Sequence, residues 1–403
     1  LIKYRGGFFM HNLYYVAIII LMGMIMARLV SMLKLPNVTG YLIAGVLIGP
    51  SLLNLVPREI STNLGIISEA ALGFIAYSIG SEINFNHLKK VGKSLITITF
   101  FEAVFPIVLV TLTMIFVFKQ PISFALVIGA IASATAPAAT IMIIKQYKAK
   151  GPVVDTLLPV VAMDDAIAII SFGVAFTIAK SFMKVGVEFS IVQAIFMPIW
   201  EILLALIVGF IFGFILCYMI PKIKGEDELL SAVIVSLFMA IGFAEFLNVS
   251  TLLVCMMVGI TVSNLAHNSI RAISIINRIT PPIYIAFFTL AGVELDLGVL
   301  RYAGLMGIGY VVVRSLGKAI GASIGAKLTN ADKMVQRYLG LTLLPQAGVA
   351  IGLSMIAQTV MPEFGTTIRT IILASTVIYE LIGPVIAKTA LVKAGEINLK
   401  ELA

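Results

Sequence analysis

Apolar runs of about 20 residues recur from one end of the chain to the other, and each is long enough for one helix to cross a bilayer. Short segments containing Gly, Pro, Asn and charged residues separate these runs. The predicted spans are residues 12–33, 38–53, 64–81, 93–117, 121–144, 155–180, 195–219, 227–244, 248–264, 280–296, 301–327, 333–359 and 366–395. The pattern therefore predicts an all-α integral membrane protein of about thirteen transmembrane helices.

The composition agrees with this pattern. Of the 403 residues, 60% are apolar and 12% are charged, and the mean hydropathy is +1.08. Soluble domains carry roughly 25% charged residues, so lipid is expected to surround most of this surface. No stretch remains for a soluble domain, and residues 1–403 are predicted to form a single transmembrane unit. Cys217 and Cys255 both lie in apolar runs and predict neither a disulfide nor a metal site.

The positive charge is distributed unevenly between the two sets of predicted loops. Of the 28 Lys and Arg residues, 18 fall in the set that contains the C-terminus and 8 in the other. Because cytoplasmic loops carry the excess of Lys and Arg, the C-terminus is predicted to be cytoplasmic and the N-terminus external. We expect a multi-pass protein of the cell membrane, the inner membrane if the source is bacterial. The same rule accounts for the pI of about 9.3 without a nucleic-acid partner.

The chain resembles itself at two places. Residues 35–53 resemble residues 247–265, and residues 80–88 resemble residues 292–300. This similarity predicts a first repeat at 12–180, a linker helix at 195–219 and a second repeat at 227–395, with six spans on either side of the linker. The two repeats would have opposite orientations in the membrane, which is typical of secondary transporters. The alternative is chance similarity between apolar sequences.

Two predicted spans contain a proline at a corresponding position. SATAPAAT includes Thr135 and Pro137, and LLPQAGVAIG includes Pro345 and Gln346. A proline removes a backbone donor and leaves a carbonyl free one turn earlier, so both spans are predicted to be broken helices near the bilayer midplane. Free carbonyls and helix ends there can serve an ion. The alternative is an ordinary proline kink.

Three charged residues lie in the middle of apolar spans. Asp164 and Asp165 are adjacent in the sixth span, and Lys318 lies in the eleventh among small residues that permit close helix contact. A carboxylate at the bilayer centre costs about 2.5 kcal/mol or more, so a functional role is expected. The two aspartates point about 100° apart, which predicts two different roles. A buried lysine needs a counter-charge, and one of these aspartates is the natural candidate; the alternative is a static ion pair.

Glu102, Arg314 and Glu380 are secondary candidates at membrane depth. For these we expect a structural pair, either Arg314 with Glu380 or Glu102 with Arg314, rather than an ion ligand. The three histidines show no metal-site spacing. The sequence contains no nucleophile motif, Walker loop or dinucleotide fingerprint, so we expect neither an enzyme nor a bound cofactor.

Taken together, the Asp164–Asp165 pair, the break at Thr135–Pro137, the Leu-Gly-Lys318 helix and the GVEL helix end at 292–295 resemble the second group of monovalent cation:proton antiporters, in the Na⁺/H⁺ exchanger superfamily. The resemblance covers nearly the whole chain in order. It implies a homodimer in which each protomer has a dimerisation domain and a core domain of six helices. It departs from some members at Gln346 and Ala347, where they have a Gly-Glu pair, and we expect no soluble nucleotide-sensing domain like that of potassium-efflux relatives.

The resemblance implies that Asp165 binds the cation, Asp164 pairs with Lys318, and Thr135 supplies an oxygen at the crossover. The expected function is exchange of Na⁺ or Li⁺ for H⁺ by alternating access, electrogenic if two protons move per cation. The alternatives are a K⁺/H⁺ antiporter, which would be electroneutral if Lys318 is only structural, and a channel or sodium-coupled symporter.

Overall fold

The computed structural model describes the backbone of residues 2–4, 7–82, 85–182 and 191–397, and the side chains of Pro137 and Asp165 lie outside its described part. The chain divides into two compact units, Leu1–Glu82 with Ala205–Asp296, and Ile83–Leu204 with Leu297–Ala403. Each unit therefore combines a segment from the first half of the chain with one from the second half. Helix α9 (Ile191–Met219) contributes its beginning to the second unit and its end to the first.

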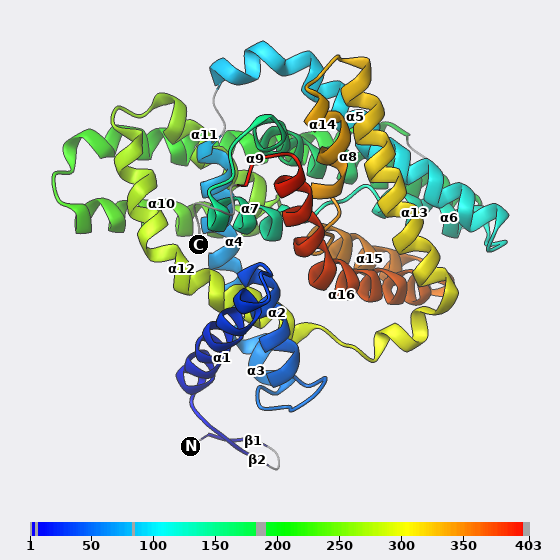
Figure 1. Cartoon of the computed structure of the whole chain (residues 1–403), viewed down its shortest axis with the longest axis horizontal. Coiled ribbons are helices and arrows are strands. Elements are labelled where there is room, and N and C mark those ends of the chain that lie inside the picture. The colour runs from blue at the N-terminus through cyan, green and yellow to red at the C-terminus, as the bar shows by residue number, and fades with distance from the viewer. Residues whose placement is uncertain (1, 5–6, 83–84, 183–190, 398–403) are drawn as a thin grey trace. The chain divides into compact units, whose positions relative to one another are not determined.

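The first unit is helical apart from a short hairpin at its start (Figure 1). Its elements are β1 (Ile2–Tyr4), β2 (Gly7–Phe9), α1 (Asn12–Met32), α2 (Asn37–Ile48), α3 (Arg58–Asn63), α4 (Gly65–Glu82), the 3-10 helix η1 (Ile220–Lys222), α10 (Glu226–Phe246), α11 (Thr251–Leu265) and α12 (Ser269–Glu294). The two strands pair antiparallel, with Ile2 opposite Phe9. The hydrophobic pattern did not predict this hairpin.

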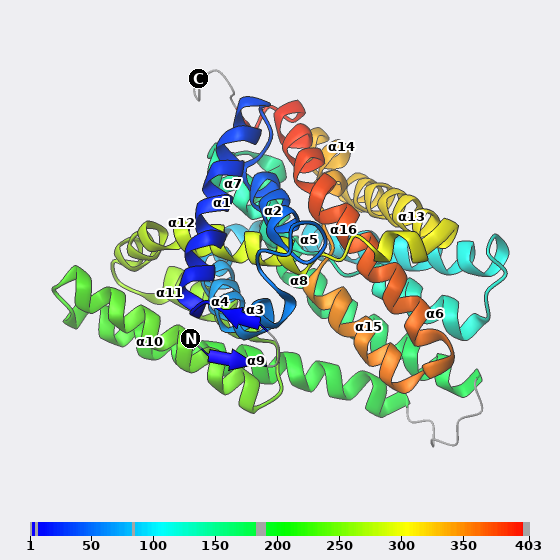
Figure 2. The ribbon, with the colours of Figure 1, turned by 90° about the horizontal axis from the view of Figure 1, so that it is seen from below.

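The second unit consists of helices in its described part (Figure 2). They are α5 (Phe85–Phe116), α6 (Ile122–Ile131), α7 (Pro137–Tyr147), α8 (Pro152–Phe182), α13 (Val299–Leu328), α14 (Lys333–Thr342), α15 (Gly348–Val360) and α16 (Pro362–Lys393). Its apolar core joins α6, α8, α15 and α16 through buried residues such as Phe124, Phe172, Leu353 and Ile368.

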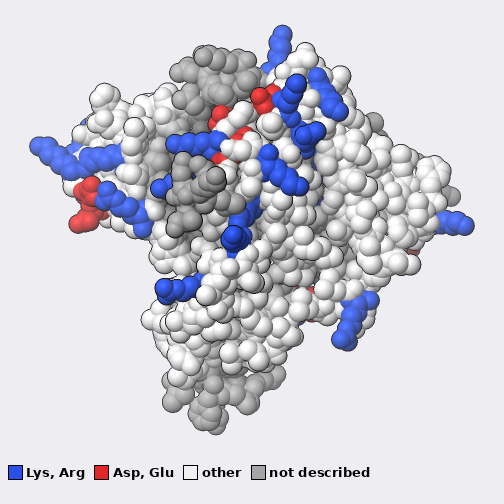
Figure 3. Space-filling model, viewed as in Figure 1, with Lys and Arg blue, Asp and Glu red and all other residues white. Residues whose placement is uncertain are grey.

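Each predicted span coincides with one helix or with a pair of helices, so the predicted all-α class is confirmed. Among the described residues, seven helices are long and apolar enough to cross a membrane by length and composition. The face drawn in Figure 3 is largely free of charged side chains, with Lys and Arg in separate groups. Both features are those expected where lipid contacts most of the surface.

Several predicted boundaries differ from the structure, among them the start of α5 at Phe85 instead of 93. Helix α2 ends at Ile48, before the predicted end at residue 53, because the chain becomes extended at Gly49 before Pro50. Helix α12 begins at Ser269, before the predicted start at residue 280, and it continues through Pro281 and Pro282. A proline inside a helix removes one hydrogen bond, and in this case the neighbouring turns maintain the helix.

Helix α13 lies close against α5 because its contact face is made of glycines. A Cβ added to Gly317 would lie 2.6 Å from the Cα of Pro106, and one added to Gly325 would lie 2.8 Å from the Cα of Ile98. Glycines four residues apart form one stripe on a helix, which lets two backbones approach. The small residues around Lys318 thus serve the close packing that the sequence predicted, and they bring α5 within reach of the lysine.

Candidate ion site

The two spans predicted to be broken, at Pro137 and at Pro345, are both broken. The first break runs from Ala132 to Ala136, between α6 and α7, and Pro137 is the first residue of α7. The second runs from Leu343 to Ala347, between α14 and α15. The two breaks contact each other directly, since the amide of Ala136 donates to the carbonyl of Pro345 at 2.8 Å. The two broken helices therefore meet at their interrupted turns.

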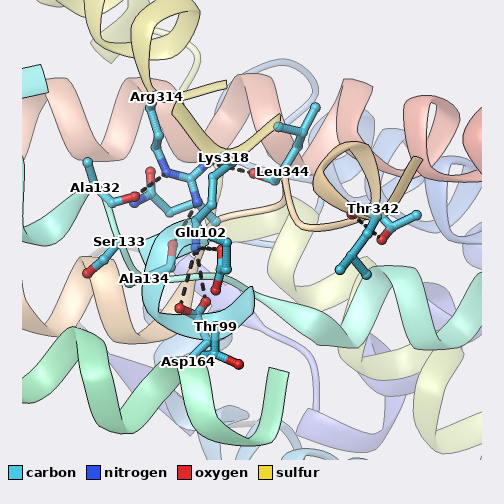
Figure 4. Close-up of polar contacts among 12 residues, drawn as sticks. Thr99, Glu102, Ala132, Ser133, Ala134, Asp164, Arg314, Lys318, Thr342 and Leu344 are labelled. Atoms are coloured by element: carbon cyan, nitrogen blue, oxygen red, sulfur yellow. Dashed lines mark hydrogen bonds and ion pairs between the residues drawn. The ribbon is translucent and has the colours of Figure 1, made fainter. Parts of the chain in front are cut away.

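Arg314 holds the two breaks together (Figure 4). Its Nε donates to the carbonyl of Ala132 at 2.9 Å, and its two terminal nitrogens donate at 2.7 Å to the carbonyls of Ala134 and Leu344. The guanidinium is fully buried. A planar group with several fixed donors suits three carbonyls left free at two helix C-termini, where a positive charge is also favoured by the helix dipoles.

Two further side chains link the breaks. The Nε2 of Gln346 donates to the carbonyl of Ile131 at 3.0 Å and to the hydroxyl of Tyr310 at 2.9 Å. Thr140 donates through its hydroxyl to the carbonyl of Thr342 at 3.0 Å. Gln346 thus satisfies the end of α6 from the opposite break.

Lys318 lies between two carboxylates (Figure 4). Its ammonium is 2.6 Å from Oε2 of Glu102 and 3.1 Å from Oδ2 of Asp164. All three residues are completely buried. The expected contact between Lys318 and Asp164 is present, and the shorter contact to Glu102 was not predicted. With both acids ionised the group would carry one net negative charge, so a single proton or cation would neutralise it.

The predicted pairing of the secondary residues was wrong. Glu102 pairs with Lys318 and not with Arg314, because the glycine stripe of α13 brings α5 against Lys318. Arg314 pairs with neither Glu102 nor Glu380 among the described contacts, because three backbone carbonyls occupy its nitrogens. The signal for this role was present in the sequence, since the two breaks that it predicted leave carbonyls in need of donors.

The remaining predicted residues surround this group. Asp165 follows Asp164 in α8, and its side chain lies outside the described part of the structure. Thr135 is at the first break and 5% exposed, and its hydroxyl oxygen has no hydrogen-bond partner among the described atoms. An unpartnered buried hydroxyl is costly unless something else satisfies it. The described residues contain no cluster of three or more His, Cys, Asp or Glu side chains suited to a metal ion.

Another polar contact escaped the sequence reasoning. The carboxylate of Glu396 accepts from the backbone amides of Val153 at 2.6 Å and Val154 at 2.9 Å, in the first turn of α8. The segment after α16 therefore caps the helix that carries Asp164 and Asp165. Burial raises the pKa of Glu396, and the two amide donors oppose this effect. The cap joins residues far apart in sequence, and no local pattern indicates it.

Comparison with known proteins gives consistent results. A family model described as "Sodium/hydrogen exchanger, transmembrane" matches residues 16–393. The Na⁺/H⁺ antiporter NhaS4 of Synechocystis sp. is 25% identical over 382 residues, covering 86% of this chain and 91% of that protein. A Na⁺/H⁺ antiporter of Enterococcus hirae is 23% identical over 362 residues, with coverage of 86% and 91%.

A solved structure shares the fold. The sodium proton antiporter MjNhaP1 from Methanocaldococcus jannaschii, determined at pH 8, superposes with a TM-score of 0.73. The alignment covers 96% of this chain and 98% of that one, with 17% sequence identity. At this level of identity the likeness concerns the fold, which extends over both compact units.

Proposed function

Because the chain belongs to the family of transmembrane sodium/hydrogen exchangers, a family of multi-pass membrane transporters, we propose that it exchanges Na⁺ or Li⁺ for H⁺ as a secondary active transporter. The observation that carries this proposal is the buried Glu102–Lys318–Asp164 group beside two helices broken at corresponding places. Such an arrangement is expensive in a lipid-facing protein unless charge is bound and released there.

Asp165 is the proposed cation ligand. It follows Asp164 in α8, whose mid-portion lies in the same unit as both breaks. The adjacent Asp164 is already engaged by Lys318, which leaves the neighbouring carboxylate for a different task. Thr135, whose buried hydroxyl has no partner among the described atoms, is a suitable second oxygen ligand. Oxygen ligands of this kind suit a hard monovalent cation.

Exchange follows from charge competition at this site. Binding of Na⁺ favours the ionised form of the carboxylates and so releases protons, and protonation removes the charge that holds the cation. An empty ionised site is costly to move through lipid, so movement is favoured only with a proton or a cation bound. This restriction couples the two fluxes and gives alternating access, with the second compact unit as the moving core.

The transport is proposed to be electrogenic, with two protons for each cation, so that the membrane potential contributes about 2.3 kcal/mol per 100 mV for each net charge moved. We further propose a homodimer in a cell membrane, in which each protomer contains two inverted repeats at 12–180 and 227–395 and has an external N-terminus and a cytoplasmic C-terminus. The loop charges support this orientation, and the internal sequence similarity supports the repeats.

The test is decay of an imposed pH gradient in proteoliposomes on addition of Na⁺, Li⁺ or K⁺. We expect Na⁺ and Li⁺ to dissipate the gradient and the Asp165→Asn protein to be inactive. Asp155→Asn is the matched control, because Asp155 is an exposed carboxylate in the first turn of the same helix. A response to K⁺ alone would favour the K⁺/H⁺ alternative, and full activity of Asp165→Asn would refute the assigned site.

A further inference from the structure

Glu380 is a buried carboxyl group that forms no ion pair with any described residue. It lies in α16 of the second unit and is 7% exposed. Among the described residues, no side chain or backbone group forms a hydrogen bond or ion pair with its carboxyl group. Burying an isolated carboxylate costs far more than burying its neutral form, so this group is stable inside the protein only when its charge is neutralised.

Glu380 faces the region where the two broken helices meet. Thr376, Glu380 and Gly383 are spaced by four and three residues and therefore share one face of α16. A Cβ on Gly383 would lie 3.0 Å from Cγ of Pro345, so this face packs against the second break. Pro345 in turn accepts from the amide of Ala136 in the first break. Glu380 thus lies about one helical turn along α16 from Gly383, the residue that contacts the second break.

Thr376 provides an independent sign of an incomplete polar site. Its side chain is 3% exposed, and its hydroxyl oxygen has no hydrogen-bond partner among the described atoms. Two polar side chains on one buried face, both lacking a described partner, are rare in folded proteins. A feature that leaves both unsatisfied has a structural cost, which suggests that they serve something that binds there.

The cations of the surrounding helices are either bonded to other groups or exposed to solvent. On α13, Arg314 is bound to three carbonyls and Lys318 to Glu102 and Asp164, while Arg301 and Lys327 are exposed. On α14, Lys333 and Arg337 are exposed. On α7, Lys145 is half-buried, and helices α6 and α15 carry no charged residue.

On α16 itself, Lys388 lies over the ring of Tyr147, 4.6 Å from its centroid. It is two turns away from Glu380 along the helix. Of the other cations of α16, Arg369 donates to Oε1 of Gln358, and Lys393 is exposed in the last turn. No cation of the described part is therefore placed to form an ion pair with Glu380, in contrast to Glu102 and Asp164. The carboxyl group must obtain its neutralising charge from solution.

We propose that Glu380, assisted by the Thr376 hydroxyl, is a second proton-binding group of the transport cycle, separate from Asp165. A proton suits this pair better than Na⁺ does. A carboxylate binds a proton by itself, whereas a cation stripped of water needs several oxygen ligands, and one carboxylate and one hydroxyl are too few. In this role the ionised carboxylate takes up one H⁺ to become the neutral acid and later releases it.

This inference rests on the proposed exchange function and assigns its second proton. Protonation at Asp165 alone would exchange one H⁺ for one Na⁺ and move no net charge. Protonation at Glu380 as well would carry two H⁺ per Na⁺ and move one net charge. Replacing Glu380 by Gln removes the second proton while leaving Asp165 intact, so the exchanger should still function but without net charge movement.

The experiment measures the voltage at which exchange stops in proteoliposomes with a valinomycin-set potential and equal pH on both sides. Exchange of two protons for one Na⁺ is balanced by about 59 mV against a tenfold Na⁺ gradient, since tenfold corresponds to 59 mV for one charge. We expect this balance in the unmodified protein and in Glu363→Gln, which changes an exposed carboxylate near the start of the same helix. We expect exchange that does not respond to voltage in Glu380→Gln.

An unchanged balance voltage in Glu380→Gln would overturn the inference, because it would show Glu380 to be a permanently neutral structural acid. A Gln variant that does not elute as a single species in detergent is not folded. In that case the test rests on the voltage dependence of the unmodified protein. Voltage-independent exchange in the unmodified protein would leave no place for a second proton and would also overturn the inference. Absence of any Na⁺-driven proton movement in the unmodified protein would instead refute the proposed function.

Discussion

Lys318 is expected to hold the second unit together by neutralising two buried acids. Its ammonium is 2.6 Å from Glu102 and 3.1 Å from Asp164, with no exposure of any of the three residues. In Lys318→Gln both carboxyl groups lose this positive charge, and the protein must either bury uncompensated charge or bind two protons. Removing one partner of a buried ion pair costs about 3–5 kcal/mol of unfolding free energy.

The structure ranks two members of the group, Lys318 and Glu102. In Glu102→Gln the amide fills the same space and Lys318 still faces Asp164, so the group becomes neutral. We expect this variant to lose much less stability than Lys318→Gln. The double variant should be less destabilised than the sum of the two single ones, because removing Glu102 leaves fewer carboxyl groups without a cation.

The assay is thermal unfolding of the purified proteins in detergent at pH 7, with Lys327→Gln as the control. Lys327 is exposed in the last turn of the same helix, so its loss should change the unfolding temperature little. We expect the order control, Glu102→Gln, double variant, Lys318→Gln, from most to least stable. Equal stability of Lys318→Gln and the control, or a larger loss in Glu102→Gln than in Lys318→Gln, would refute the reasoning.

Three further predictions concern contacts that support the site. Arg314→Lys should lose about 2 kcal/mol or more of unfolding free energy, because an ammonium cannot satisfy three carbonyls at once; Arg301→Lys, exposed on the same helix, is the control. Gly321→Ala should lower the unfolding temperature, because its Cβ would lie 3.0 Å from the Cα of Glu102, whereas Gly242→Ala, with open space, should not. Burial raises the folded-state pKa of Glu396, so its contribution favours folding at acid pH and is lost as the pH rises through and above 4.5. The stability of the unmodified protein relative to Glu396→Gln should therefore fall with rising pH, and a rise would contradict this sign.

The membrane helices could be predicted from the sequence because they depend on a local property. Twenty consecutive apolar residues have one stable conformation in lipid, since each backbone group must find its partner within the helix. The two breaks were also predicted from local sequence, at Pro137 and Pro345, although proline alone does not decide a break, since Pro281 and Pro282 lie inside a continuous helix. The functional weight of Asp164 and Asp165 was also visible, because a charge in an apolar run is expensive wherever the neighbouring helices lie.

The partners of those charges could not be predicted in the same way. Lys318 meets Glu102 across 216 residues of sequence, and the contact exists because glycines of α13 admit α5. Arg314 was expected to seek a carboxylate, yet the geometry of two opposed helix ends gives it carbonyls. Glu380, one of the two partners predicted for Arg314, has no described partner. Hydrophobicity determines which residues enter the membrane, but only the packing of one helix on another determines which buried charge each of them meets.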